Sequence, residues 1–235
     1  MPARVARFVN VVGLELLGGL LVLTLGAWVF GVMVEELSEG DTHLDTRFAA
    51  WLHERATPGW TSFFEKVTWL GNVPVLAVVT VVTGIVLWRI RRKAELELLL
   101  LAVIGTQVLT LGLKLGFARE RPFFPDPLAT ESSYSFPSGH SSMSLAVYGT
   151  LGYIAARHAA GRRRQIAALA GSAALVLLIG FSRLYLGVHY LSDVIAGFSL
   201  ALAWVALCVV LLHLRLRLRT HRAGQTSRYR ASAKQ

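Results

Sequence analysis

The chain has 235 residues, of which 54% are hydrophobic and 16% are charged, and its mean hydropathy is +0.53. A composition this apolar excludes an ordinary soluble domain and fits a polytopic membrane protein. The formal net charge of +10 would suit a nucleic-acid-binding protein, but the placement of the basic residues, described below, argues against that class. The single cysteine, Cys208, excludes a disulfide framework and a thiolate metal site.

Six apolar runs follow one another along the chain, near residues 8–34, 67–88, 96–117, 140–156, 166–184 and 190–214. Each is about long enough to cross a hydrocarbon core roughly 30 Å thick. The first run follows two arginines, as a signal peptide would, but it is too long for one and is interpreted as an uncleaved anchor. The fourth is rich in small and hydroxyl residues, which suit packing between helices better than contact with lipid. The sequence therefore predicts an all-α fold, a bundle of six transmembrane helices.

Most of the 24 lysines and arginines lie in the N terminus, in the loops after the second and fourth runs, and in the tail after the sixth. With six spans, all four segments fall on one side of the membrane, and the positive-inside rule makes that side cytoplasmic. We therefore predict a multi-pass protein of the cell membrane with both termini in the cytoplasm. Residues 1–222 form its membrane domain, and residues 223–235 form a basic, disordered tail. Topology and contact with anionic lipids explain the tail's charge better than nucleic acid does.

The loop between the first two runs, residues 35–66, begins with acidic residues and then carries Leu44, Phe48, Trp51 and Leu52 at roughly helical spacing. This pattern predicts an amphipathic helix lying on the outer membrane surface. A packed segment that covers the end of the bundle explains the pattern equally well.

Two cations lie at the end of the third run, in the sequence KLGFARERP. Lys114 and Arg121 are seven residues apart, so on a helix they can share one face. Pro122 disfavours helix at the residue before it. Arginine offers a planar fork to phosphate oxygens and lysine a point charge. The alternative is that both side chains extend to the membrane interface.

The fourth run opens with Pro137, Ser138, Gly139 and His140. The glycine permits a tight turn, and successive backbone N–H groups there can form an anion-binding concavity. Ser138 can donate a hydroxyl proton or cap the helix, and His140 can exchange a proton near neutral pH. Taken alone, the motif is better explained as an ordinary helix start, and His140 shifts the balance toward a chemical role.

The segment SRLYLGVHYLSD joins the fifth and sixth runs. His189 and Asp193 are four residues apart, so on a helix the carboxylate can hydrogen-bond one imidazole nitrogen and leave the other as a nucleophile. Arg183 would supply a third phosphate cation. A structural His–Asp pair explains His189 and Asp193 alone, but it does not explain Arg183 or the other two motifs. With six spans, all three motifs reach the outer face of the membrane.

Together the motifs resemble the signature K-x6-RP, PSGH, SR-x5-H-x3-D of the type 2 phosphatidic acid phosphatase family, which shares its active-site pattern with vanadium haloperoxidases. Every signature position is matched between residues 114 and 193. The resemblance implies a phosphatase that acts on lipid phosphates or diphosphates at the membrane surface, with no metal and no cofactor. It assigns phosphate binding to Lys114, Arg121, Ser138, Gly139 and Arg183. It makes His189 the nucleophile, Asp193 its orienting partner and His140 the acid that protonates the leaving oxygen.

The leading substrate that we expect is undecaprenyl diphosphate, because a small six-span protein with an outward site suits carrier-lipid recycling in a bacterial envelope. Phosphatidylglycerol phosphate and phosphatidic acid are the alternatives. The expected mechanism proceeds through a phosphohistidine, with three cations balancing the phosphate charge. An anion transporter would place charges near the bilayer midplane, and a haloperoxidase would normally be soluble, so the sequence favours neither. The oligomeric state, and whether the loop 125–136 acts as a lid, stay open.

Overall fold

The computed structural model describes the backbone of residues 2–40 and 42–232, and the side chains of residues 16–40 and 42–218. This part of the chain contains helices, turns and loops and no strand, in agreement with the predicted all-α fold. The helices are α1 (Pro2–Glu39), α2 (His43–His53), α3 (Pro58–Trp69), α4 (Val73–Arg89), α5 (Lys93–Phe117), α6 (Gly139–Ser144), the π-helical turn η1 (Leu145–Gly149), α7 (Thr150–His158), α8 (Arg162–Tyr185) and α9 (Leu191–Ser232).

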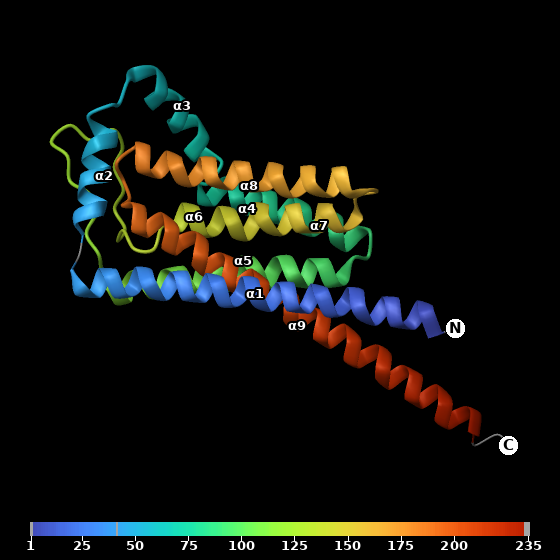
Figure 1. The fold of residues 1–235 in the computed structure, drawn as a ribbon. Helices are drawn as coiled ribbons and strands as arrows, with labels where there is room; N and C mark the ends of the chain where they lie inside the picture. The colour runs from blue at the N-terminus through green and yellow to red at the C-terminus, as the bar shows by residue number, and fades with distance from the viewer. Residues whose placement is uncertain (1, 41, 233–235) are drawn as a thin grey trace.

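The long helices run side by side, and α2 lies across one end of the bundle (Figure 1). Both termini lie away from that end (Figure 1). α1 packs along α9, while α6, η1 and α7 follow one another as a single rod that contacts α5 and α8. The rod is central to the bundle, and it begins at the end that α2 covers.

Four described helical segments are long and apolar enough to cross a membrane, namely residues 16–39, α5, α8 and residues 191–218. α3 and α4 make a fifth candidate if one span can include the 41° bend between them. The rod 139–158 replaces the predicted span 140–156, but the π-helical turn divides it into three short pieces. The predicted count of six transmembrane helices is therefore not confirmed, although the fold is that of a helical membrane protein.

The bend between α3 and α4 brings the chain close to α8 and α6. A Cβ atom on Gly71 would lie 2.6 Å from Cγ2 of Ile179 and 3.0 Å from Cδ2 of His140. Only a residue without a side chain allows this approach. As a consequence, Thr68 and Asn72, on either side of the glycine, reach the charged end of the bundle.

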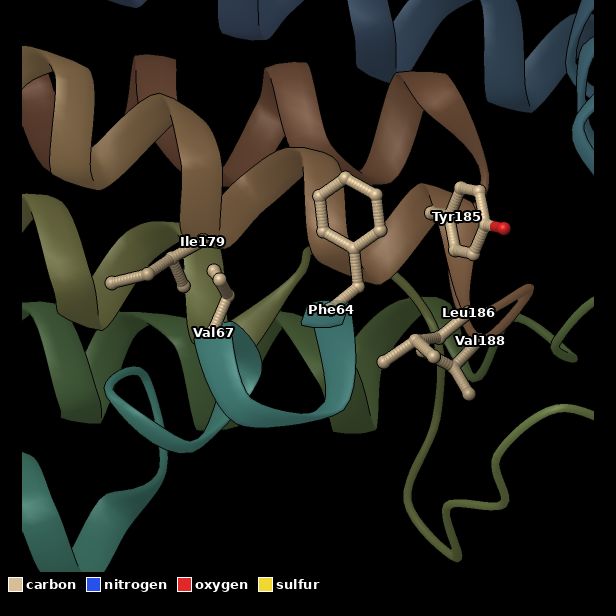
Figure 2. Close-up of a cluster of buried hydrophobic side chains, with 6 residues drawn as sticks. All are labelled: Phe64, Val67, Ile179, Tyr185, Leu186 and Val188. Carbon is tan, nitrogen blue, oxygen red and sulfur yellow. The ribbon is translucent and has the colours of Figure 1, made fainter. Parts of the chain in front are cut away.

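A cluster of buried apolar side chains attaches α3 to the end of α8 and to the turn that follows it (Figure 2). Its members are Phe64, Val67, Ile179, Tyr185, Leu186 and Val188. Burying an apolar side chain of this size stabilises the fold by about 1.5–3 kcal/mol. The hydroxyl of Tyr185 adds a polar contact, because it accepts a hydrogen bond from the N–H of Thr57 at 2.9 Å. The cluster therefore holds the start of α3 and the last turn of α8 together beside Arg183.

α2 is amphipathic, as its spacing predicts. Asp45, Ala49 and Leu52 are buried and the helix packs against α8 and α9, whereas Leu44 is 71% exposed and Trp51 is 48% exposed. The buried face covers the end of the bundle, which was one of the two expectations. The exposed face is mixed, because it carries the polar His43, Thr46 and Arg47 as well as the apolar Leu44 and Trp51.

Disorder is predicted for residues 223–235, but the backbone of α9 continues as a helix to Ser232. Residues 233–235 lie outside the described part of the chain. Alanine and arginine, which recur in this segment, favour helix.

Candidate active site

The three sequence motifs meet at the end of the bundle that α2 covers. The charged or titratable members of the group, Lys114, Arg121, His140, Arg183 and His189, lie close enough to one another to interact electrostatically. They come from α5, the loop after it, α6, α8 and the α8–α9 turn. The residues predicted to form one site are thus brought together in space, and their chemical roles stay predictions.

His189 is buried in the turn between α8 and α9. Its Nδ1 lies 3.3 Å from Oδ2 of Asp193 and 3.2 Å from Oγ of Ser135. The Ser135 hydroxyl donates to the same carboxylate oxygen at 2.5 Å, as does the N–H of Tyr190 at 2.8 Å. α9 begins at Leu191, so His189 precedes the helix on which it was expected to lie, with Asp193 in the first turn. The predicted contact still forms, because the turn folds His189 back over the start of α9.

The other nitrogen of His189 faces a cation. Nη1 of Arg121 lies 3.1 Å from Nε2 of His189, and a guanidinium can only donate. Nε2 therefore offers its lone pair, and Nδ1 carries the proton and faces Asp193. Burial lowers the pKa of His189 to about 3, although Asp193 acts in the opposite direction. The imidazole is neutral at neutral pH and presents a nucleophilic nitrogen to the cations.

Lys114 and Arg121 converge in a different way from the one their spacing predicts. α5 ends at Phe117, and Ala118 takes a left-handed conformation with φ of 45°. Arg121 therefore lies beyond the helix, and the prediction that the two side chains share a helix face is wrong. They meet because the chain folds back, so that both donate to the carbonyl oxygen of Tyr134.

Arg183 is the most deeply buried of the three predicted phosphate cations, with 3% of its surface exposed. Its Nη1 donates to Oγ1 of Thr68 at 2.7 Å, and its Nη2 pairs with the carboxylate of Glu131. Among the described residues, its buried Nε–H has no hydrogen-bond acceptor. An unsatisfied buried donor costs about 1–3 kcal/mol, and an anion oxygen would satisfy it.

Ser138 caps α6, and Gly139 is the first residue of that helix. The N–H of Ser138 donates to the backbone oxygen of Asp193 at 2.9 Å, which joins the PSGH motif to the start of α9. Oγ of Ser138 accepts hydrogen bonds from the N–H and the hydroxyl of Ser141. His140 follows, with Nε2 at 2.7 Å from Oδ1 of Asn72 in the α3–α4 break.

The loop between α5 and α6 supplies partners to every predicted phosphate cation. Glu131 pairs with Arg183, while the oxygens of Ser133 and Tyr134 accept from Arg121 and Lys114. Earlier in the loop, Asp126 lies 3.0 Å from Nε2 of His53 and Phe124 stacks on the same imidazole ring, which attaches the loop to α2. The loop 125–136, whose role as a lid the sequence did not decide, therefore lies directly on the three cations Lys114, Arg121 and Arg183.

Several polar residues of the site were not predicted from the sequence. They are Asp45, Thr68, Asn72, Arg119, Glu131 and Ser135. Arg119 had a local signal, because it is a charge inside the first motif. The others lie outside the motifs and no local pattern distinguishes them. In the part of the chain whose side chains are described, no group of three or more His, Cys, Asp or Glu side chains is placed to hold a metal ion.

Several known proteins resemble this chain in sequence and fold. The family model described as the PAP2 superfamily matches residues 95–217, which include all three motifs. Phosphatidylglycerophosphatase B of Bacillus subtilis (strain 168) is 37% identical over 156 residues, covering 65% of this chain and 71% of the relative. The crystal structure of a transmembrane PAP2 type phosphatidylglycerolphosphate phosphatase from Bacillus subtilis has a TM-score of 0.71 at 28% identity, covering 78% of this chain and 93% of that one. LpxE from Aquifex aeolicus has a TM-score of 0.58 at 26% identity, covering 71% and 94%.

Proposed function

The chain belongs to the PAP2 superfamily and is a membrane phosphatase of lipid phosphates, and we propose that its substrate is phosphatidylglycerol phosphate. The support is the identity of 37% to phosphatidylglycerophosphatase B and the likeness of fold to a phosphatidylglycerolphosphate phosphatase. Undecaprenyl diphosphate, the leading expectation from the sequence, gives way to this alternative. That expectation depended only on chain size and topology, which related phosphatases share. Phosphatidic acid is the remaining competitor.

We infer a phosphohistidine mechanism, and the orientation of His189 is the observation that carries it. With Nδ1 on Asp193 and Nε2 toward Arg121, the neutral imidazole can attack phosphorus in line. A bond forms between Nε2 and phosphorus as the bond to the lipid oxygen breaks, and His140 gives that oxygen a proton. Burial and the neighbouring cations lower the pKa of His140 to about 2, so this step requires the negative charge of the bound phosphate to raise that pKa and keep His140 protonated. Water then attacks the phosphohistidine while His140 takes a proton from it. Inorganic phosphate leaves, and the electron pair returns to Nε2.

The phosphate charge is balanced in this mechanism by Lys114, Arg121 and Arg183. Their contacts with the α5–α6 loop are replaced by phosphate oxygens, so the loop must shift when substrate binds. Ser138 accepts two hydrogen bonds and has its own hydroxyl proton to donate to the phosphate. Gly139 adds a backbone N–H at the start of the rod.

The topology that we propose places both termini in the cytoplasm and the site at the outer face. The motifs and α2 lie at one end of the bundle, away from both termini (Figure 1). The basic N terminus, the basic tail and the basic loops after α4 and α7 lie away from the site. The positive-inside rule assigns basic segments of this kind to the cytoplasm.

Phosphate release by the purified protein in detergent tests the function. Phosphatidylglycerol phosphate, phosphatidic acid and undecaprenyl diphosphate are offered side by side, to the wild type, to His189→Ala and to a control, His43→Ala, which alters an exposed histidine on α2. We expect phosphatidylglycerol phosphate to be hydrolysed fastest, and release to be lost only in His189→Ala. A faster rate with either other lipid would overturn the substrate assignment, and release by His189→Ala would overturn the nucleophile.

A further inference from the structure

Arg119 lies in the loop after α5, between two buried carboxylates. Its Nη1 donates to Oδ1 of Asp193 and its Nη2 to Oδ2 of Asp45, both at 2.7 Å. Its guanidinium carbon also lies 4.3 Å from the centre of the Tyr190 ring, close enough for a cation–π contact. Two ion pairs and an aromatic ring thus hold this side chain in a single position.

The two oxygens of the Asp193 carboxylate have separate partners. Oδ2 faces Nδ1 of His189 and accepts from Ser135 and Tyr190. Oδ1 accepts from Arg119. Rotation of the carboxylate would therefore break hydrogen bonds at both oxygens. Arg119 fixes the plane of the group that faces the proposed nucleophile.

Asp45 extends this arrangement to α2. Oδ1 of Asp45 accepts from the N–H of Ser192 at 2.9 Å, and its Oδ2 accepts from the Ser192 hydroxyl. Arg119 closes the network by donating to Oγ of Ser192 at 2.8 Å. Since Ser192 precedes Asp193 in the first turn of α9, Asp45 anchors both Arg119 and the start of that helix.

Arg119 supplies the positive charge that the two carboxylates of this network share. Burial acts to lower the pKa of Arg119, but Asp193 and Asp45 more than offset this and raise it above its ordinary value. Arg119 is therefore always charged. Without it, two buried carboxylates would face each other with no cation between them, and each would resist ionisation.

We propose that Arg119 and Asp45 are positioning residues for the phosphatase reaction, which act through Asp193 to hold His189 in its nucleophilic orientation. The inference depends on the phosphohistidine chemistry proposed above. Neither residue touches the reacting phosphate, because both lie on the Nδ1 side of His189. A role confined to attaching α2 to α9 would affect folding without a selective effect on turnover.

The first test compares kcat and KM of Arg119→Gln, Arg119→Lys and Asp45→Asn with those of Arg47→Gln, which alters an exposed arginine on α2. By analogy with residues that orient metal ligands, we expect kcat of Arg119→Gln to fall about 10- to 100-fold. The kcat of Arg119→Lys should fall less, because lysine keeps one positive charge there but cannot span both carboxylates. KM should change by less than about threefold, since the phosphate cations are untouched.

The second test is a double-mutant cycle between Arg119→Gln and Asp193→Asn. If Arg119 acts through Asp193, then Arg119→Gln should reduce the residual rate of Asp193→Asn by no more than about twofold, whereas independent residues multiply their effects. Multiplied losses would overturn the inference, as would a kcat for Arg119→Gln equal to that of Arg47→Gln.

Two controls keep the outcomes separate. If Arg119→Gln does not elute from gel filtration like the wild type, Arg119→Lys decides the question. A fall in its kcat at unchanged KM supports the inference, and wild-type kcat overturns it. Loss of activity in His189→Ala together with full activity in Arg119→Gln would overturn this inference alone. Full activity in His189→Ala would overturn the proposed function as well.

Discussion

The two sides of the His189 ring differ in how their charges are balanced. On the Nδ1 side, one cation, Arg119, meets two carboxylates, and both ion pairs join side chains with less than a tenth of their surface exposed. On the Nε2 side, three cations meet one carboxylate, Glu131, and otherwise backbone carbonyls and the hydroxyls of Ser133 and Thr68. The first side has an excess of negative charge, whereas the second has an excess of positive charge that an anion would balance.

The two sides also differ in what holds them. On the Nδ1 side, buried side chains join α2 and the start of the α5–α6 loop to α9. The Nε2 side depends on residues 131–134, which are exposed to solvent. Exposed contacts can be exchanged for those of a ligand at little free-energy cost. We propose that one side orients the histidine and the other receives phosphate, and the experiments below test that division.

The largest effect is expected from breaking the Nδ1 side. Asp193→Asn should lower kcat about 10³- to 10⁴-fold, by analogy with loss of the aspartate of a catalytic triad, because the imidazole loses its orienting acceptor. KM for the lipid should stay within a few-fold of the wild-type value. Steady-state phosphate release measures both, and a rise in KM with unchanged kcat would assign Asp193 to binding.

Breaking the Nε2 side should affect binding and turnover together. Arg183→Ala should lower kcat/KM about 10²- to 10³-fold, because it removes a preorganised donor from the phosphate charge. Arg163→Ala, which alters an exposed arginine near the start of α8, is the matched control and should be unaffected. Equal kcat/KM in the two variants would show that Arg183 has only a structural role, in its contacts with Glu131 and Thr68, and does not act on the phosphate.

Removing the carboxylate of Glu131 should have the opposite effect on substrate binding from removing one of the cations. Glu131→Gln removes the carboxylate that competes with phosphate for Arg183, so KM should fall roughly two- to fivefold, in line with a partly exposed ion pair. The exposed Glu54→Gln serves as the control. A higher KM in Glu131→Gln would mean that the carboxylate helps to form the site.

The neutrality of His189 predicts a dependence of stability on pH. Its pKa of about 3 lies below the ordinary value of 6.5, so below pH 6.5 the unfolded chain binds a proton that the folded chain does not. The stability associated with this group is therefore fully present above pH 6.5 and declines as the pH falls toward 3. Between pH 7 and pH 5, Tm should fall a few degrees more in the wild type than in His189→Asn. Equal falls would contradict the lowered pKa.

The smallest effect is expected from metal removal. Three cations and the helix-start N–H groups supply the positive charge that the reaction needs, so EDTA should change the rate of phosphate release by less than about twofold. Release is measured before and after dialysis against EDTA, and again with added Mg²⁺. Loss on dialysis and recovery with Mg²⁺ would require a metal that the proposed mechanism does not include.

Much of the fold of this protein could be predicted from local features of its sequence. The lengths of the apolar runs predicted α5, α8 and the membrane part of α9 to within a few residues, because hydropathy and backbone hydrogen bonding act over short distances along the chain. The motifs also contained the cations and histidines that meet at the site, since their chemistry is a property of the residue types. The remaining features of the fold and the site depend on how the helices pack, which local sequence does not specify.

Only the tertiary structure decided where the helices break and what supports His189. Ala118 ends α5 before Arg121, and Gly71 is needed at the α3–α4 bend because α8 lies against it. Arg119 reaches Asp45 and Asp193 across 74 residues in each direction along the chain. Contacts at that separation leave no periodic pattern, because they depend on how helices pack rather than on the spacing of side chains along one helix. The motif residues that meet at the candidate site could therefore be selected from the sequence, whereas the residues elsewhere in the chain that contact them could not.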